Sequence, residues 1–181
     1  MRIIAGTARG RRLKAPRGDS VRPTADRARE ALFSILATRI AGARVFDLCA
    51  GTGAVGLEAL SRGAELAIFV ERDRAALEAL RANVAACGAA DRSAIHETDV
   101  VAFLEGAGRP GPRDLVFADP PWAGDLGERI LALLGGAPPG LFVLEHDSRR
   151  PPAPGAGSLG LLRTVVHGDT GLSFYENTGP P

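Results

Sequence analysis

The sequence predicts an α/β fold: a doubly wound, mostly parallel sheet that ends in a C-terminal antiparallel hairpin. From residue 44 onward, short apolar runs alternate with segments whose apolar residues recur at helical spacing. The chain has 181 residues, of which 45% are hydrophobic, enough for a domain with a substantial core. The last two strand-like segments are separated only by Gly-Asp-Thr-Gly, which is typical of a hairpin turn.

The N-terminal region differs from the rest of the chain in charge. Residues 1–39 hold ten Lys or Arg against three Asp or Glu, a balance of +7, whereas residues 40–181 carry −6. Two strand-like pieces, 2–5 and 11–15, flank a glycine-bounded turn and predict a β-hairpin with Arg9, Arg11, Arg12 and Lys14 near its tip. Such a basic block indicates contact with the phosphates of a nucleic acid, although an ordinary solvated surface is the alternative.

The remaining elements follow in order. Thr24 is expected to cap a helix over 25–38. The expected strands are 45–48, 66–70, 93–96, 115–118, 141–145, 161–167 and 172–176. Helices are expected after the glycine-rich turn to residue 61, between Asp73 and Gly88, after Asp99, and over 126–134. Residues 147–158 are predicted to be a loop. We therefore divide the chain into a basic extension, 1–40, and an α/β domain, 41–181.

A glycine-rich turn follows the first expected strand. Gly51, Gly53 and Gly56 match the spacing G-x-G-x-x-G, and Glu71 ends the second strand twenty residues after Gly51. This spacing also occurs in dinucleotide-binding proteins, where the turn holds a pyrophosphate and the acid binds ribose hydroxyls. The pattern alone therefore leaves two classes of ligand open.

The acids around this turn favour a cationic ligand. Asp47 stands just before the turn, where it would repel a pyrophosphate but attract the sulfonium and ammonium of S-adenosylmethionine. Asp99, at the end of the third strand, can accept from an adenine amino group while Val100 lies against the ring. The predicted cofactor-binding residues are Asp47, Cys49, Ala50, Gly51, Thr52, Gly53, Glu71, Arg72, Asp99 and Val100.

The stretch Asp119-Pro120-Pro121-Trp122 follows the fourth strand, where open α/β sheets bind their ligands. The exocyclic amine of a nucleobase is a poor nucleophile because its lone pair is delocalised into the ring. Asp119 and the Pro120 carbonyl can accept its two N–H groups and aim the nitrogen at a methyl group, while the two prolines stiffen the loop. Trp122 offers a surface for stacking the base, although filling the core is its ordinary role. These four residues are the predicted catalytic set.

Several segments together resemble the RsmD family, bacterial enzymes that methylate the N2 amine of one guanine in 16S ribosomal RNA. They are R-P-T-A-D-R-A-R-E-A-L-F (22–33), D-L-C-A-G-T-G-A-V-G-L-E-A-L-S-R-G-A (47–64) and F-A-D-P-P-W (117–122). The last matches the (Asn or Asp)-Pro-Pro-(Phe, Tyr or Trp) motif of class I amino-nitrogen methyltransferases. The resemblance implies a Rossmann-like sheet of seven strands and an N-terminal arm for RNA. It also suggests that the polar face of the first helix, with Arg22, Thr24, Arg27 and Glu30, closes over the donor or the target nucleotide. Ordinary helix capping and a surface pair between Arg27 and Glu30 are the alternative.

Alternatives remain within this prediction. Asp-Pro-Pro-Trp also occurs in adenine-N6 methyltransferases of RNA or DNA, and the family motif more often ends in Phe or Tyr than in the Trp122 found here. Methylation of a protein side-chain amide is a further alternative, against which the basic arm argues. A non-catalytic RNA-binding role is another, against which Asp119 argues.

The remaining composition excludes other classes of protein. The chain has two cysteines and three histidines that form no metal or nucleophile pattern, so no metal is expected. Neither a membrane-spanning run nor a signal peptide is evident, which predicts a cytoplasmic protein. The expected partner is ribosomal RNA or the small-subunit particle, and the chain is expected to be a monomer.

Overall fold

The computed structural model describes residues 1–15, 23–106 and 108–179, with the backbone alone at 23–26. Its described strands form one eight-stranded sheet in the order β3-β2-β1-β4-β5-β8-β7-β6. Five strands are mutually parallel: β1 (Arg44–Leu48), β2 (Leu66–Glu71), β3 (Ser93–Glu97), β4 (Leu115–Ala118) and β5 (Leu141–Asp147). The antiparallel strands are β6 (Gly155–Ala156), β7 (Leu159–His167) and β8 (Thr170–Asn177).

The predicted fold class is confirmed, with one strand more than the seven expected. The additional strand is β6, a two-residue segment that pairs with the start of β7 inside the region predicted to be a loop. The sequence shows no strand pattern there, because a strand of two residues is too short to have a detectable periodicity.

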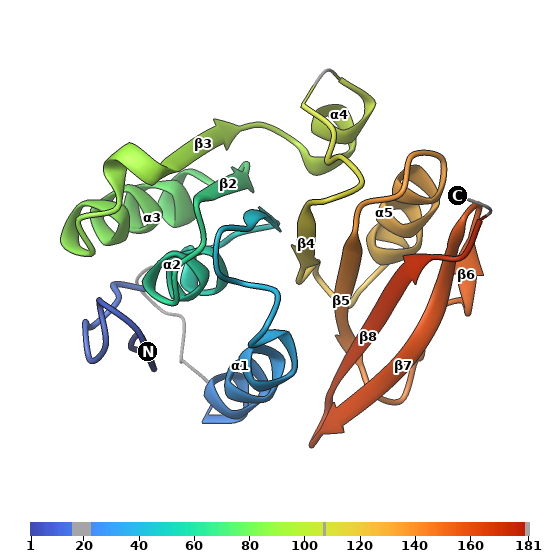
Figure 1. Cartoon of the computed structure of the whole chain (residues 1–181), viewed down its shortest axis with the longest axis horizontal. Coiled ribbons are helices and arrows are strands. Elements are labelled where there is room, and N and C mark those ends of the chain that lie inside the picture. The colour runs from blue at the N-terminus through green and yellow to red at the C-terminus, as the bar shows by residue number, and fades with distance from the viewer. Residues whose placement is uncertain (16–22, 107, 180–181) are drawn as a thin grey trace.

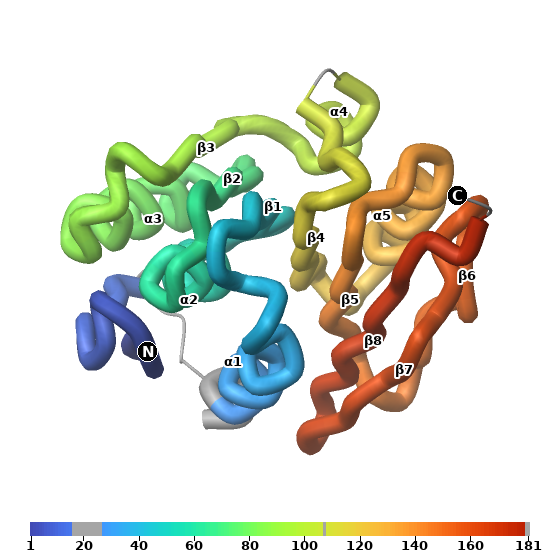
Figure 2. Tube along the Cα trace, viewed as in Figure 1, coloured from blue at the N-terminus to red at the C-terminus, as the bar shows by residue number. Residues whose placement is uncertain are grey.

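Helices cover both faces of the sheet. One core cluster joins α1 (Pro23–Leu36), α2 (Ala54–Ser61) and α3 (Arg74–Ala86) to one set of strand residues. A second cluster joins α4 (Val100–Glu105) and α5 (Leu126–Gly135) to the alternate residues of the same strands. Figures 1 and 2 show this arrangement, with α4 and α5 on the side of the sheet away from α1 and α2. The sheet is therefore doubly wound, and its central parallel strands, β1, β2, β4 and β5, are buried on both faces.

Two local predictions at the N-terminus need correction. The first helix begins at Pro23, so Thr24 lies in its first turn rather than at the cap. Proline is well suited to this first helical position because its missing N–H would have no partner there. The predicted hairpin is reduced to one antiparallel bridge, between Arg2 and Arg12, with backbone hydrogen bonds on either side. By contrast, Asp73 caps α3 as predicted, accepting from the Ala76 N–H at 2.8 Å.

The N-terminal arm, residues 1–15, is fixed to the α/β domain by buried polar side chains. The fully buried Glu58 of α2 accepts hydrogen bonds from the Ile4 and Ala5 N–H groups at 2.7 and 3.0 Å. Asn83 of α3, also fully buried, binds Lys14. Ile3 of the arm belongs to the same core cluster as α1, α2 and α3. Among the described helices none is long and apolar enough to cross a membrane.

Candidate active site

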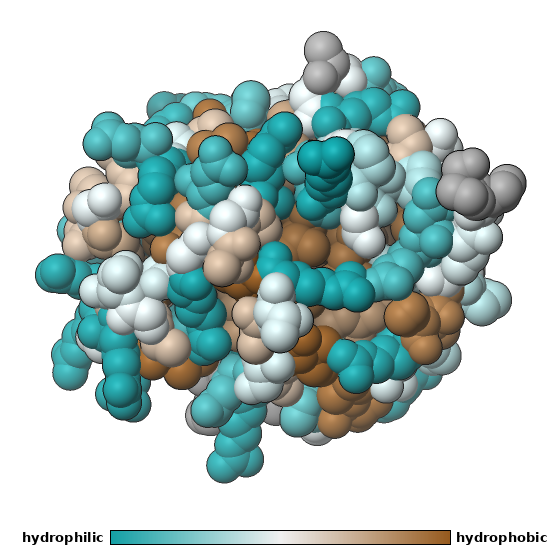
Figure 3. All heavy atoms as spheres, in the orientation of Figure 1, coloured by the Kyte–Doolittle hydropathy of each residue, from teal (hydrophilic) through white to brown (hydrophobic). Residues whose placement is uncertain are grey.

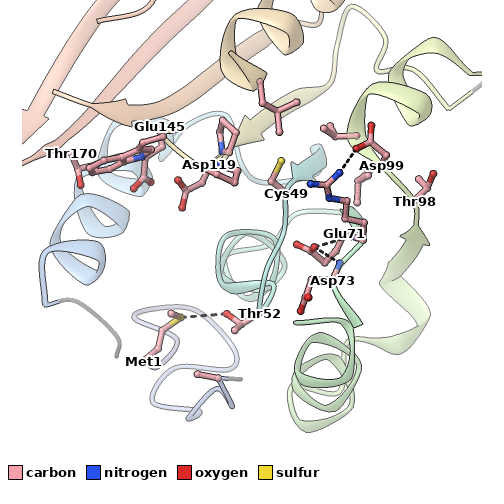
Figure 4. Close-up of a pocket in the computed structure, with 18 of the residues that line it drawn as sticks. Met1, Cys49, Thr52, Glu71, Asp73, Thr98, Asp99, Asp119, Glu145 and Thr170 are labelled. Carbon is pink, nitrogen blue, oxygen red and sulfur yellow. Dashed lines mark hydrogen bonds and ion pairs between the residues drawn. The ribbon is translucent and has the colours of Figure 1, made fainter. Parts of the chain in front are cut away.

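A cleft of about 830 Å³ opens where the parallel strands end. Its lining includes Cys49 after β1, Glu71 at the end of β2, Asp99 after β3, Asp119 after β4 and Glu145 near the end of β5. Figure 4 shows Asp119, Glu145 and Thr170 on one side of this cleft and Glu71, Asp73 and Asp99 on the other. Figure 3 shows apolar atoms in a recess surrounded by hydrophilic side chains on one face of the molecule. The cleft therefore occupies the place where open parallel sheets bind their ligands.

The glycine-rich turn is shaped by close approaches of its backbone to the core. Gly53 has φ +78°, and a Cβ there would lie 2.3 Å from a Leu80 methyl. A Cβ on Gly56 would lie 2.3 Å from the Phe69 ring, so only glycine lets α2 pack this closely. Cys49 has φ +62°, a strained value for a residue with a side chain. The turn thus holds Cys49 and Thr52 against the cleft.

Glu71 connects this turn to the end of β2. Its Oε2 accepts from the Gly51 N–H at 2.7 Å, and its Oε1 accepts from the Arg72 and Asp73 N–H groups, both at 2.8 Å. A carboxylate offers about four lone-pair sites, so one site remains after these three bonds. A carboxylate fixed in this way at the edge of a cleft is a suitable acceptor for ligand hydroxyl groups.

Asp99 and Arg72 form the wall beyond Glu71. Asp99 Oδ1 accepts from the Val101 N–H at 2.9 Å and so caps α4, while its Oδ2 lies 3.0 Å from Arg72 Nη1. Val100 follows directly and also lines the cleft. The Asp99 side chain is 40% exposed and can still reach a ligand. Both residues therefore line the cleft directly after β3.

Asp47 lies beneath the glycine-rich turn. It is 2% exposed, is absent from the described lining, and accepts from the Gly56 N–H at 2.9 Å. Burial raises its pKa to about 8; the Gly56 hydrogen bond opposes this shift, and the charges of Asp119 and Glu71 add to it. Asp47 therefore supports the glycine-rich turn from beneath and is not part of the described lining of the cleft.

Burial also explains why Cys49 is a poor nucleophile. It raises the pKa of the thiol to about 12, with the neighbouring Glu71 carboxylate as the next largest cause. The thiol is therefore protonated at neutral pH, and a thiolate mechanism finds no support here.

The four residues predicted to be catalytic all line the cleft. Asp119 is exposed, Pro120 is buried, and Trp122 is partly buried. Pro120, Pro121 and Trp122 also line a smaller cavity of about 150 Å³ behind the loop. The loop therefore forms a wall between two cavities, with Asp119 on the side of the larger one.

The other predicted site residues divide into three groups. Cys49, Thr52, Glu71, Arg72, Asp99 and Val100 line the cleft, whereas Asp47, Ala50, Gly51 and Gly53 lie outside its lining. The basic side chains proposed for RNA are exposed at Arg9, Arg11, Arg12, Lys14 and Arg27. Arg22 and the side chain of Thr24 lie outside the described part of the chain.

Several lining residues were not predicted. Met1 and Ala15 reach the cleft from the N-terminal arm, Asp169 from the turn between β7 and β8, and Thr170 from the start of β8. Thr52 Oγ1 lies 3.7 Å from the Met1 sulfur. These residues come from segments distant in sequence, and no local motif marks them.

The charge of the lining distinguishes the two classes of ligand. Six carboxylate side chains line the described cleft, at Glu71, Asp73, Asp99, Asp119, Glu145 and Asp169, against one guanidinium, that of Arg72. Such a lining repels a pyrophosphate and attracts a cation. Among the described residues no three His, Cys, Asp or Glu side chains form a metal-binding group. The residues present therefore fit a positively charged nucleoside better than a dinucleotide.

Comparison with known proteins supports this assignment. The family model described as Conserved hypothetical protein 95 matches residues 1–176. The chain is 34% identical to a protein named putative rRNA methyltransferase YlbH from Bacillus subtilis, over 99% of this chain and 100% of that protein. It is 31% identical to ribosomal RNA small subunit methyltransferase D of Haemophilus influenzae, over 98% and 94% of the two chains. The structure of a putative methyltransferase, yhhF, from Escherichia coli superposes with a TM-score of 0.82 and 35% identity, covering 99% of both chains.

Proposed function

The chain belongs to the RsmD family of methyltransferases, and we propose that it transfers a methyl group from S-adenosylmethionine to the N2 amine of a guanine in 16S ribosomal RNA. The observation that carries this proposal is that Asp119 shares an acid-rich cleft with Glu71 and Asp99. The cleft therefore combines acceptors for an adenosine with an acceptor for a substrate amine.

The donor half of the cleft would hold the adenosine. Bound S-adenosylmethionine supplies a methyl group on a positively charged sulfur, which is already a good leaving group. Glu71 is fixed by three backbone N–H groups and would accept from the ribose hydroxyls. Asp99 and Val100 line the cleft beside it and would border the adenine. Asp47 accepts from the Gly56 N–H and so holds the glycine-rich turn in place.

The acceptor half of the cleft would hold the target amine. In our proposal Asp119 and the Pro120 carbonyl each accept one N–H of the amine, so that its lone pair is directed toward the methyl group. Positioning of this kind contributes up to about 7–11 kcal/mol in favourable cases. No covalent nucleophile is needed, in keeping with the raised pKa of Cys49. Trp122 stacks on the extracted base, which offsets part of the cost of unstacking it.

The basic extension, residues 1–40, would bind RNA. Arg9, Arg11, Arg12 and Lys14 are exposed on an arm whose ends, Met1 and Ala15, border the cleft. Phosphate contacts on this arm would direct the RNA toward the site, and residues 41–181 would carry out the methyl transfer. Arg22, Thr24 and Arg27 remain candidates for closing over the site.

Nucleoside analysis tests the proposal. The protein and S-adenosylmethionine are incubated with small subunits or ribosomal RNA that lack the modification, and the digested nucleosides are analysed by mass spectrometry with mapping of the site. We expect N2-methylguanosine at one position. N6-methyladenosine without N2-methylguanosine would favour the adenine alternative, and salt-sensitive RNA binding without methyl transfer would favour a non-catalytic factor.

A further inference from the structure

A second carboxylate, that of Glu145 in β5, lies at the level where the chain leaves β4 at Asp119. β4 and β5 are parallel, with Ala118 opposite Leu144, so extending this register by one residue places Asp119 beside Glu145. Neighbouring strands lie about 4.8 Å apart, and residues at the same level point to the same face. Both residues line the cleft, and Figure 4 shows them on the same side of it.

The other acidic side chains of the cleft do not lie beside Asp119 on a neighbouring strand. Glu71 is bonded to three backbone N–H groups, and Asp99 caps α4 and pairs with Arg72. Both belong to the side of the cleft that lies opposite Asp119 in Figure 4. Asp73 caps α3 on that same side. Asp169 comes from the turn before β8 rather than from a neighbouring strand end. Glu145 is therefore the carboxylate placed to meet whatever group adjoins an amine held by Asp119.

Guanine and adenine differ at that adjoining position. On the Watson–Crick edge of guanine, the N2 amine is next to N1–H, a hydrogen-bond donor. In adenine, the N6 amine is next to an unprotonated N1, which is an acceptor. A carboxylate accepts a hydrogen bond from guanine N1–H. Opposite adenine it faces the lone pair of N1, so that neither the carboxylate nor N1 has a hydrogen-bond donor. Enzymes that act on extracted bases read this edge through such hydrogen bonds.

We propose that Glu145 determines specificity for guanine by accepting the N1–H hydrogen bond while Asp119 holds the N2 amine. This inference rests on the proposed function and extends it to the choice of base. Asp119 alone accepts from any amine, so it cannot separate the two bases. The pair of carboxylates on neighbouring strand ends matches the adjacent donors of guanine.

The base 2,6-diaminopurine tests the proposed role of Glu145, because it keeps the N2 amine but has an unprotonated N1. Once the target nucleotide is mapped, it is replaced by 2,6-diaminopurine in ribosomal RNA, and kcat/KM is measured for both substrates. We expect wild type to prefer guanine by on the order of 10²-fold, less than the 10⁴–10⁵ of fully enclosed sites because Glu145 is partly exposed. Taking the ratio within one protein cancels any difference in the folded fraction.

Glu145→Gln is the decisive variant, because a glutamine amide can either accept from N1–H or donate to an unprotonated N1. We expect its preference for guanine to fall to less than about tenfold, with increased activity on the diaminopurine substrate. Asp147→Asn, two residues further along β5 and bonded to Arg149, is the matched control and should keep the wild-type ratio. An unchanged ratio in Glu145→Gln, or loss of activity on both substrates in a folded variant, would overturn the inference. The proposed function fails separately if wild type forms no N2-methylguanosine.

Discussion

The buried side chain of Asn83 holds the backbone of Lys14 by two hydrogen bonds. Its Oδ1 accepts from the Lys14 N–H at 2.7 Å, and its Nδ2 donates to the Lys14 carbonyl at 3.0 Å. The same Nδ2 donates to the Thr52 carbonyl at 3.0 Å. One residue of α3 thus connects the basic arm to the glycine-rich turn, and so links the proposed RNA-binding and donor-binding parts of the molecule.

Removing this link should affect both parts. In Asn83→Ala three backbone groups lose their partner, and we expect a loss of about 1–3 kcal/mol in the free energy of unfolding. We also expect weaker binding of both S-adenosylhomocysteine and RNA, measured by calorimetry and filter binding. Glu78→Ala, at an exposed position on the same helix, is the control and should change neither. Normal donor affinity in a destabilised Asn83→Ala protein would contradict the link.

Charge reversal on the exposed surface of the arm should act on RNA alone. We expect the double variant Arg11→Glu, Arg12→Glu to have a higher KM for RNA. The slope of the logarithm of the binding constant against the logarithm of the salt concentration should decrease in magnitude by about one for each phosphate that is no longer neutralised. Donor affinity should not change, because neither side chain lines the cleft. Arg129→Glu, on the exposed surface of α5, serves as the control. An equal fall in donor affinity would argue against this division between arm and cleft.

The pKa of Asp47 predicts a dependence of stability on pH. The folded pKa is raised to about 8, whereas an unfolded aspartate titrates near 3.8. Between these values the unfolded chain is ionised while the folded protein keeps its proton. The contribution of Asp47 to stability should therefore fall as the pH rises from about 4 to about 8, by at most about 1.4 kcal/mol per pH unit, and level off above that range.

Urea unfolding of Asp47→Asn at several pH values measures this contribution. The asparagine carbonyl can still accept from the Gly56 N–H but does not titrate. The difference in stability between variant and wild type should therefore shift in favour of Asp47→Asn as the pH rises from about 5 to about 8.5. A difference that is constant over this range would show that Asp47 keeps an ordinary pKa in the folded protein.

Much of the fold could be predicted because its signals are local. Apolar runs, the caps Asp73 and Asp99, and Gly88 after α3 mark elements within a few residues of each boundary. The start of α1 was misplaced because Pro23 and Thr24 are both suitable near a helix start. The strand β6 was missed because its pairing depends on the position of β7 rather than on its own residues.

The site could be predicted only where a motif lies at a strand end. Asp119 and Glu71 follow from this rule, and both reach the cleft. Asp47 was placed at the correct strand end but not under the turn, because sequence position does not reveal that the Gly56 N–H lies within its reach. Met1 and Thr170 reach the cleft through tertiary packing, which leaves no local pattern.

The role of Asp119 in holding the reacting amine can be tested by the single-turnover rate of methyl transfer to RNA in Asp119→Ala and Asp119→Asn. Asparagine keeps a carbonyl oxygen that accepts from an amine, whereas alanine does not. We expect Asp119→Ala to slow the transfer on the order of 10²–10³-fold, a loss comparable to that of one transition-state hydrogen bond, while Asp119→Asn retains much more of the rate. Affinity for S-adenosylhomocysteine should be unchanged in both. A wild-type rate in Asp119→Ala would contradict the claim that this residue holds the reacting amine.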